Sequence, residues 1–493
     1  MKKILFFGLK NLSTQNLSTQ LEIMSNHIEK GDEVYVLRCN SFLPKCYSNF
    51  YKLKSVCFRC RLNFDSGMNL LNLPKKNIFT IKDKANYCDF PKEFKNQNEL
   101  LRFAALGGVK FGFGVVSNLI SELKNSQLDT IKYKVEIEKS LKSSILIYES
   151  VYELLQFLKP NIFYVWNGRF FDVWPAIEAC KKLNVEFYTY ENTPSMYKYS
   201  IFKNRLPHDL QAIKKEIETS WSESILEKSE KERRAKQFFI NKRNKSDLYS
   251  WVKEQNEQEL PKNFDITKTN IAIFNSSLNE YEAFDEYKIP IYLDENDAVN
   301  KIIEEFKDRK DIVFYLRVHP QLRGLDNYQI RKLKDIEALK FEHFKIIWPE
   351  EKVDSYALLD SCDKVVSFHS TIGVEACFWG KPSILIGKAF YEDLGCCYIP
   401  KNHSEVLKYI NSTLTPLPLI GPLKYGHWMS SIGTPYKKYQ PLTISTGNFM
   451  GKGLWSCVSL KNKLKLKSLV LQDFGFKNLL VNKLKKIIKG KTK

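Results

Sequence analysis

The sequence has no run of 18 or more apolar residues, which excludes a membrane-spanning helix. Residues Met1–Leu9 resemble the start of a signal peptide, but the apolar stretch is short and Lys10-Asn11 follows where a cleavage site needs small residues. We therefore expect a buried first strand at Lys3–Gly8 and a cytoplasmic protein. The cysteine count of 11 is odd, and the chain is long, so a secreted disulfide framework is also excluded.

The composition is that of a globular protein with a basic tail. Of the 493 residues, 43% are hydrophobic and 13% aromatic, which excludes wholesale disorder and suits two or three domains. Half of the net charge of +20 lies in residues 461–493, where 11 lysines face one acid, Asp473 (11 − 1 = +10). Because this tail lacks interleaved tryptophan or tyrosine, the charge does not indicate nucleic-acid binding.

The first half of the chain alternates strands and helices. The chain begins with a strand at Lys3–Gly8, a helix at about 15–29 and a strand at Glu33–Arg38. This order is typical of the start of a doubly wound sheet. We expect one long helix over about 119–158, and then a βαβ unit over residues 162–190.

A second alternating series follows a charged region at 208–262, which we interpret as surface helices and a linker. The expected strands of this series are 271–274, 312–318, 345–348, 364–368 and 383–386. The fold class is therefore α/β, with two doubly wound, Rossmann-like domains that face a cleft. The predicted divisions are an N-terminal domain at 1–207, a helical linker at 208–265, a C-terminal domain at 266–415 and an extension at 416–493.

The strand at 312–318 ends in Arg317-Val318-His319-Pro320. Alternation places Arg317 and His319 on one face, and Pro320 ends the strand, so His319 lies at its carboxyl end. A guanidinium and an imidazole at that place suit an anionic ligand such as a phosphate. The alternative is a structural histidine beside a surface arginine.

A strand runs directly into a helix at residues 365–376. Ser370 or Thr371 is the expected N-cap, and the free N–H groups of a helix start favour a phosphate. Glu375 lies one turn later, where it could bind ribose hydroxyls. Ordinary helix capping is the alternative for this segment alone.

These motifs resemble those of the capsule polysaccharide synthesis glycosyltransferases. The matching elements are Arg317-x-His319-Pro320, Ser370-Thr371-x-Gly373-x-Glu375-Ala376 and Gly380-Lys381-Pro382. The family has two-lobed GT-B enzymes, including Kdo transferases, and its layout is similar to that of bacterial sialyl- and polysialyltransferases. The resemblance covers about residues 271–398. It implies that His319, Ser370 and Thr371 hold the phosphate of a CMP-activated sugar.

The N-terminal half supplies the candidates for catalysis. Asn167-Gly168-Arg169 follows one strand and Glu191 ends the next, so these residues should face the cleft. Glycosyl transfer needs a carboxylate near the acceptor hydroxyl, and we expect Glu191, with Asp172 as second candidate, to supply it. Asn167 and Arg169 would then bind the acceptor or a carboxylate of the donor. The alternative is a structural pair between Glu191 and Arg169.

Four cysteines cluster near the N-terminus, namely Cys39, Cys46, Cys57 and Cys60. Four thiolates within 22 residues suit a structural zinc or an iron–sulfur cluster, although a zinc ribbon would show a second CxxC pair. Buried or surface free thiols are the alternative.

The tail has an amphipathic pattern. Over Lys477–Lys489 the residues Leu480, Leu484, Ile487 and Ile488 share one helical face, with lysines around the others. This pattern indicates a helix that lies on an anionic membrane surface, or one that packs on the N-terminal lobe.

Together these features predict a metal-independent GT-B glycosyltransferase, peripheral on the inner face of the cell membrane. Its partners would be a nucleotide sugar and a glycan or lipid-linked acceptor, with Arg317, His319, Ser370 and Thr371 stabilising charge on the leaving phosphate. No clear Asp-x-Asp metal motif lies near these residues. The alternatives are a CDP-polyol-phosphate transferase of the teichoic-acid type and a non-catalytic sugar- or nucleotide-binding assembly factor.

Overall fold

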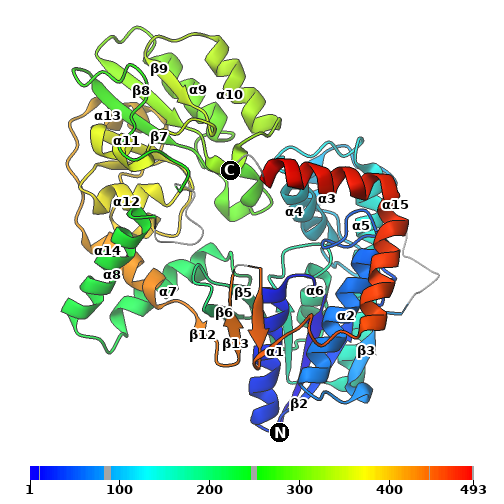
Figure 1. Ribbon diagram of the computed structural model, residues 1–493. Coiled ribbons are helices and arrows are strands. Elements are labelled where there is room, and N and C mark those ends of the chain that lie inside the picture. Colours follow the sequence, from blue (N-terminus) through cyan, green and yellow to red (C-terminus); the bar gives the residue numbers. More distant parts are fainter. Residues whose placement is uncertain (10, 83–89, 246–252, 444, 491–493) are drawn as a thin grey trace. The chain divides into compact units, whose positions relative to one another are not determined.

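The computed structural model describes residues 1–9, 11–82, 90–245, 253–443 and 445–490, with side chains to residue 475. The chain forms two compact units (Figure 1). Unit 1 holds residues 1–118, 129–207 and 433–493, and unit 2 holds residues 119–128 and 208–432. The domain boundaries at 207, 265 and 415 stay predictions.

Unit 1 is built on a seven-stranded sheet in the order β12-β6-β5-β4-β1-β2-β3. The strands are β1 (Lys3–Gly8), β2 (Glu33–Arg38), β3 (Ile78–Thr80), β4 (Ile162–Trp166), β5 (Phe187–Asn192), β6 (Lys198–Lys203) and β12 (Thr434–Pro435). The five strands from β5 to β3 pair in parallel, whereas β6 is antiparallel to β5. The sequence pattern predicts the central strands and misses β3, β6 and β12.

Both faces of this sheet are buried, as a parallel sheet requires. Ile4 and Phe6 of β1 pack with α1 (Thr14–Glu29) and α2 (Lys54–Leu70) on one face. Leu5 and Phe7 point to the other face and are also buried. The nearly continuous apolar run of β1 thus follows from its central place in the sheet.

The long helix expected over residues 119–158 is wrong in its start and its continuity. Two helices cover this region, α4 (Phe111–Leu123) and α5 (Lys134–Leu158). Lys124 between them adopts a φ of 52°, which breaks the helix. α5 packs against α6 (Trp174–Lys182), the helix of the predicted βαβ unit.

Unit 2 is built on a five-stranded parallel sheet in the order β11-β10-β7-β8-β9. The strands are β7 (Thr269–Phe274), β8 (Ile312–Arg317), β9 (Phe344–Ile347), β10 (Lys364–Ser367) and β11 (Ser383–Leu385). All five agree with the strands expected from the sequence. The predicted α/β class with two doubly wound units is therefore confirmed.

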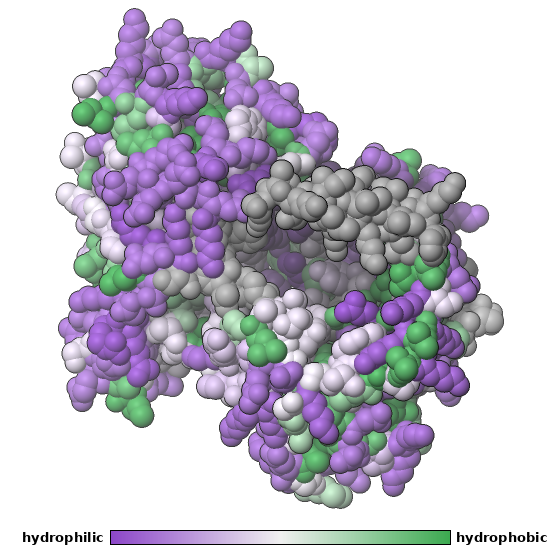
Figure 2. Space-filling model, viewed as in Figure 1, coloured by the Kyte–Doolittle hydropathy of each residue, from purple (hydrophilic) through white to green (hydrophobic). Residues whose placement is uncertain are grey.

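Helices cover both faces of the unit 2 sheet. One face packs against α9 (Glu295–Glu305), α10 (Tyr328–Ala338) and α13 (His403–Asn411). The other face packs against α11 (Ser355–Ser361) and α12 (Ile372–Phe378). On the side drawn in Figure 2, hydrophilic residues cover most of this unit and apolar residues are scattered, because the apolar side chains line the sheet.

The charged region expected to be a linker packs into unit 2. Its helices α7 (Leu210–Ser222) and α8 (Lys228–Arg243) contact α14 (Ile420–Ser431). Ile217, Phe239 and Tyr425 form the centre of a second apolar cluster there. A helix with dense surface charge can thus still anchor through a few apolar residues.

The last segment of the chain returns to unit 1. β12 pairs with β6, and the Glu22 carboxylate of α1 accepts bonds from the backbone N–H groups of Lys437, Lys438 and Tyr439. The long α15 (Leu460–Gly490) is kinked at Gly475 and packs on α2.

The predicted amphipathic face at 477–489 involves side chains that lie outside the described part of the structure, so the basic tail stays a prediction. Within the residues searched, no helix is both long and apolar enough to cross a membrane.

Candidate functional site

Each unit has one place where the strand order reverses. In unit 1 the chain moves from β1 outward to β2 and β3, and later returns to β4 on the other side of β1. In unit 2 it moves from β7 to β8 and β9, and returns to β10 beside β7. Because the loops beyond the strands diverge at such a switch point, a crevice forms there, and α/β sheets bind their ligands in it.

The loops after β7 and β8 are joined in unit 2. Asn275 follows β7 directly, and its side-chain oxygen accepts a hydrogen bond of 2.8 Å from the backbone N–H of His319 after β8. The Nδ2 of Asn275 is buried and has no hydrogen-bond partner among the residues that the structure describes. Burial lowers the pKa of His319 to about 4, and the charge of Arg317 adds to this effect, so the imidazole is neutral at pH 7.

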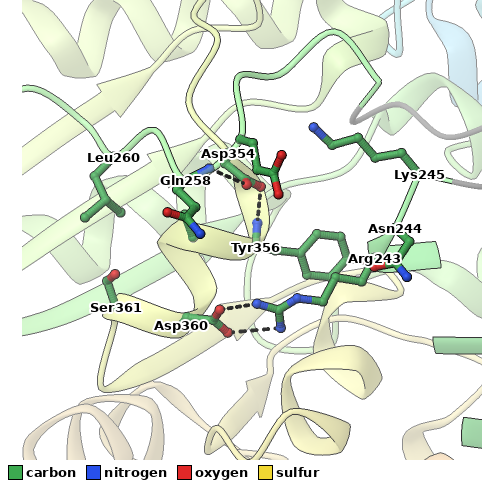
Figure 3. Close-up of a pocket in the computed structure, with 11 residues that line it drawn as sticks. Arg243, Asn244, Lys245, Gln258, Leu260, Asp354, Tyr356, Asp360 and Ser361 are labelled. Carbon is green, nitrogen blue, oxygen red and sulfur yellow. Dashed lines mark hydrogen bonds and ion pairs between the residues drawn. The ribbon is translucent and has the colours of Figure 1, made fainter. Parts of the chain in front are cut away.

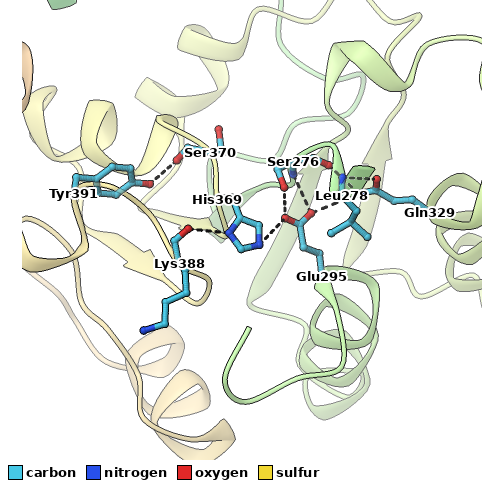
Figure 4. Close-up of polar contacts among 8 residues, drawn as sticks. All are labelled: Ser276, Leu278, Glu295, Gln329, His369, Ser370, Lys388 and Tyr391. Carbon is cyan, nitrogen blue, oxygen red and sulfur yellow. Dashed lines mark hydrogen bonds and ion pairs between the residues drawn. The ribbon is translucent and has the colours of Figure 1, made fainter. Parts of the chain in front are cut away.

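A buried polar group links β7 with the loop after β10 (Figure 4). The Glu295 carboxylate at the start of α9 accepts bonds from the backbone N–H of Ser276, at 2.9 Å, and from its hydroxyl. The Nε2 of His369 lies 4.0 Å from Glu295 Oε1, and its Nδ1 lies 2.8 Å from the carbonyl of Lys388. Burial raises the pKa of Glu295 to about 7 and lowers that of His369 to about 4.

Arg317 is brought to the end of β8, but its donors point to the backbone. Its guanidinium donates to the carbonyls of Trp348, at 2.7 Å, and Glu351, at 3.1 Å. Burial lowers its pKa to about 10. These bonds fix the loop after β9, and the expected phosphate contact of Arg317 stays a prediction.

Ser370 and Thr371 stand before α12, as expected. The Ser370 hydroxyl accepts from the backbone N–H of Ile372 at 3.3 Å, and its carbonyl accepts from the Tyr391 hydroxyl. Thr371 is the N-cap residue but makes no side-chain capping bond.

Thr371 and Glu375 instead belong to a network with α8 and α11. Lys242 donates to the Thr371 hydroxyl at 2.8 Å and to Glu375 at 2.6 Å, and Tyr356 donates to the other oxygen of Glu375 at 2.6 Å. Glu375 is 2% exposed. Its carboxylate therefore joins three helices, and a contact with ribose stays a prediction.

A large pocket of about 680 Å³ lies beside this network (Figure 3). It lies between the end of α8 and α11, where Arg243 pairs with Asp360 and Asp354 caps α11. Both charges of the ion pair are satisfied within the protein. None of the residues expected to bind the nucleotide lines this pocket, whereas Tyr356, which donates to Glu375, does.

In unit 1 the Asn-Gly-Arg element forms a tight turn after β4. Asn167 and Gly168 have φ values of 55° and 91°. The φ of Gly168 favours glycine, and a β-carbon there would also lie 2.5 Å from Ile177 Cδ1, which would have to move. The Nδ2 of Asn167 donates to Glu191 Oε2 at 2.7 Å, and the Nε1 of Trp166 donates to Oε1 at 3.2 Å.

The structure thus brings together three of the predicted residues, Glu191, Asn167 and Arg169. Burial raises the pKa of Glu191, while its hydrogen bonds and the charge of Arg169 act in the opposite direction. Arg169 lies over the Phe170 ring, 4.7 Å from its centre. Because burial has the larger effect, the pKa of Glu191 is raised, which makes its carboxylate a stronger base than an exposed one.

Asp172 is fully buried, and its Oδ2 accepts a bond of 3.3 Å from the backbone N–H of Tyr47. Tyr47 stacks on Phe170 at 4.5 Å, and Phe170 stacks on Trp166 at 5.8 Å. Asp172 therefore fixes the loop after β2 against this aromatic stack. Its predicted part in catalysis stays a prediction.

The four clustered cysteines line one small cavity of about 30 Å³ beside Lys52. Burial raises the pKa of Cys60 to about 11 and also raises that of Cys39. In the part of the chain searched, no three His, Cys, Asp or Glu side chains are grouped so that they could hold a metal ion. The zinc or iron–sulfur site predicted at these cysteines stays a prediction.

Sequence reasoning missed Ser276, Glu295 and His369. A signal for Ser276 was available, because the polar run Asn275-Ser276-Ser277 follows the apolar strand β7. The loops after β8 and β10 were identified by polar residues in the same position. Nothing in the sequence singles out Glu295, because a glutamate at a helix start is common. Its side chain is buried because α9 packs on the sheet, and that packing cannot be predicted from neighbouring residues.

Residues 278–407 match the family model described as "Capsule polysaccharide biosynthesis protein". A search of curated proteins finds no match to this chain. Among solved structures, the chain is similar to KpsC of Thermosulfurimonas dismutans, β-Kdo 2,4 transferase, at 12% identity over 63% of this chain and 87% of that one, with a TM-score of 0.36.

The β-Kdo 2,7 transferase of the same KpsC has 17% identity over 57% of this chain and 80% of that one, with a TM-score of 0.33. A UDP-GlcNAc 2-epimerase from Neisseria meningitidis has 13% identity over 95% of this chain and 100% of that one, with a TM-score of 0.25. At TM-scores this low, the similarity does not extend to the arrangement of the whole chain. The match to the family model includes the loop after β8 and the start of α12. The resemblance to capsule polysaccharide synthesis proteins that the motifs predict is therefore confirmed over residues 278–407 of unit 2.

Proposed function

We propose that the protein is a glycosyltransferase that moves a sugar from a nucleotide-activated donor to a growing capsular or lipopolysaccharide glycan. The observation that carries this proposal is the polar group at the unit 2 switch point, inside the matched segment. There Asn275 after β7 holds the backbone of His319 after β8, and His369, which directly precedes Ser370 after β10, faces Glu295. Two α/β units of this kind are the architecture of GT-B enzymes.

The donor proposed is CMP-linked, with a Kdo- or sialic-acid-like sugar, as the motifs and the Kdo transferases among the similar structures suggest. His319, Ser370 and Thr371 would hold the nucleotide phosphate in unit 2, without a metal ion. In unit 1, Glu191 would act as the base toward the acceptor, and Asn167 and Arg169 would bind the acceptor or the donor carboxylate. The basic tail would hold the protein on an anionic membrane surface.

A nucleotide panel measured by thermal unfolding tests the proposal. CMP, CDP, UMP, UDP and GDP are compared on the wild type, on His319→Gln and on His403→Gln. His403 starts α13, outside the switch point, and is the matched control. A ligand at about 100 times its dissociation constant stabilises a protein by about 2.7 kcal/mol.

We expect CMP to raise the unfolding temperature of the wild type and of His403→Gln, and to lose this effect in His319→Gln. A preference for another nucleotide would show that the donor is not CMP-linked, but it would still agree with a glycosyltransferase. CDP-polyol acceptance would identify the polyol-phosphate enzyme instead. If no nucleotide stabilises the wild type, the proposed function is wrong.

A further inference from the structure

Glu295 is a carboxylate without a cation. Its side chain is 1% exposed, and in the described part of the chain no lysine or arginine forms an ion pair with it. Its bonds come from Ser276, with a longer contact of 3.5 Å from Gln329. An ionised carboxylate in such surroundings is costly, and protonation removes that cost.

His369 is oriented so that it can share the proton of Glu295. Its Nδ1 lies 2.8 Å from the carbonyl of Lys388, and because a carbonyl only accepts, Nδ1 carries the hydrogen. The lone pair of the neutral ring then lies on Nε2, which faces Glu295 at 4.0 Å. Figure 4 shows the ring and the carboxylate pointing toward one another.

The other charged groups around the pair do not replace this proton. Asp294 is the charged neighbour of Glu295 and raises its pKa further. On the side of His369, Glu392 is the charged neighbour, and it is itself paired with Lys214 and Lys388. The rings of Tyr281 and Tyr287 cover the imidazole. Near neutral pH the pair therefore takes up at most one proton, because burial raises the pKa of Glu295 to about 7 and lowers that of His369 to about 4.

The pair also connects the two loops to which the phosphate was assigned. Glu295 is bonded to Ser276, whose neighbour Asn275 holds the backbone of His319. His369 directly precedes Ser370. A phosphate bound to these loops would repel an ionised Glu295 strongly at low dielectric, so its binding favours the protonated pair.

We propose that Glu295 and His369 form a proton-holding pair, which takes up one proton from solvent when the phosphate of the nucleotide binds at the loops after β7, β8 and β10. By taking up this proton, the pair removes the negative charge of Glu295 beside the phosphate. It does not react with the substrate. This inference rests on the proposed function, because it assumes that unit 2 binds a nucleotide.

Calorimetric titration with CMP tests the proposal. The binding enthalpy at pH 8 is measured in HEPES and in Tris, whose ionisation enthalpies differ, and the difference gives the number of protons taken up. The second ionisation of a phosphate monoester is near pH 6, so it does not contribute at pH 8. We expect uptake of about one proton, and a dissociation constant that rises up to about tenfold per pH unit above pH 7.

Glu295→Gln should abolish both effects, because the amide imitates the protonated acid and fixes the neutral state. Its affinity for CMP should then no longer fall between pH 7 and pH 8, where the phosphate is largely ionised. Glu295→Asp should keep the proton uptake. Glu282→Gln is the matched control, since burial also raises the pKa of Glu282 to about 7 but its neighbours are Asp294 and Lys288 instead of His369.

The outcomes separate the inference from the proposed function. Uptake that persists in Glu295→Gln, or its disappearance in Glu282→Gln, would overturn the inference and leave nucleotide binding intact. If Glu295→Gln does not fold, binding of CMP to the wild type without any proton uptake overturns the inference as well. A wild type that binds none of the nucleotides would overturn the proposed function and the inference together.

Discussion

At the scale of single residues, the environment of a carboxylate decides what it can do. Glu295 and Glu375 are buried and Glu191 is half-buried, and the partners of the three carboxylates differ. Lys242 compensates the charge of Glu375, whereas Glu191 receives neutral donors from Asn167 and Trp166. Burial raises the pKa of Glu191, and a raised pKa makes the carboxylate a better proton acceptor.

Replacing Glu191 by glutamine tests its role as the base. Gln keeps the shape and can still bind Asn167, but it cannot take a proton. We expect the rate of sugar transfer to fall by about 10²- to 10⁴-fold, with nucleotide binding unchanged. Glu186→Gln, which removes a carboxylate paired with Lys203 in the same unit, should keep full activity. Equal transfer rates in the two variants would contradict the assignment.

The buried His319 predicts a loss of stability in acid. Its pKa is about 4 in the folded protein and 6.5 as the ordinary value, so the unfolded chain binds more protons between these values. The contribution is therefore complete above pH 6.5 and is lost as the pH falls toward 4, by about 3 kcal/mol.

Urea unfolding of the wild type and His319→Gln at pH 4.5 and pH 7 measures this effect. The variant should lose less free energy of unfolding between the two pH values than the wild type loses. An equal loss in both proteins would show that the imidazole is already protonated in the folded state.

At the scale of elements, turns after strands place the functional side chains. The sequence pattern located most of these turns, because an apolar strand followed by polar residues is a local feature. Asn167 directly follows β4, and His319 and Ser370 lie in the short turns after β8 and β10. The local sequence does not determine where the side chains point. Arg317, for example, donates to carbonyls of the loop after β9.

Gly168→Ala tests the turn after β4. The residue has a φ of 91°, and its β-carbon would lie 2.5 Å from Ile177 Cδ1 and 2.7 Å from Leu206 Cδ2. We expect thermal and urea unfolding to show a loss of about 2–4 kcal/mol, from backbone strain and the clash. Because Asn167 holds Glu191 from this turn, the transfer rate should fall too.

Gly31→Ala is the matched control, since its φ is 78° but nothing lies within 4 Å of the added β-carbon. It should show the cost of the backbone conformation alone, about 1 kcal/mol. Equal losses in the two variants would mean that the contacts of Gly168 do not matter.

At the scale of the whole molecule, the C-terminal segment completes unit 1. Tyr439, Phe449 and Leu454 are buried in its core, and the Asp473 carboxylate accepts bonds from the backbone N–H groups of Lys54 and Ser55 at the start of α2. Residues more than 400 positions apart thus share one apolar cluster.

Ending the chain after Ile432 should destabilise unit 1 selectively. The loss of three large buried side chains corresponds to about 5 kcal/mol. Calorimetric unfolding should show a transition at lower temperature, while CMP still stabilises the part that contains unit 2. A chain that ends after Gly475 keeps these contacts and should unfold like the wild type. Unchanged unfolding of the shorter chain would contradict this account of unit 1.

The sequence by itself determined the α/β class, nearly every central strand and the loops that carry the candidate site. These features follow from apolar periodicity and from the alternation of strands and helices, which neighbouring residues set. Only the tertiary structure decided the antiparallel β6, the return of the last segment to unit 1 and the pairing of Glu295 with His369. These depend on contacts between distant parts of the chain, and the burial that sets the pKa of Glu295 exists only when α9 packs on the sheet.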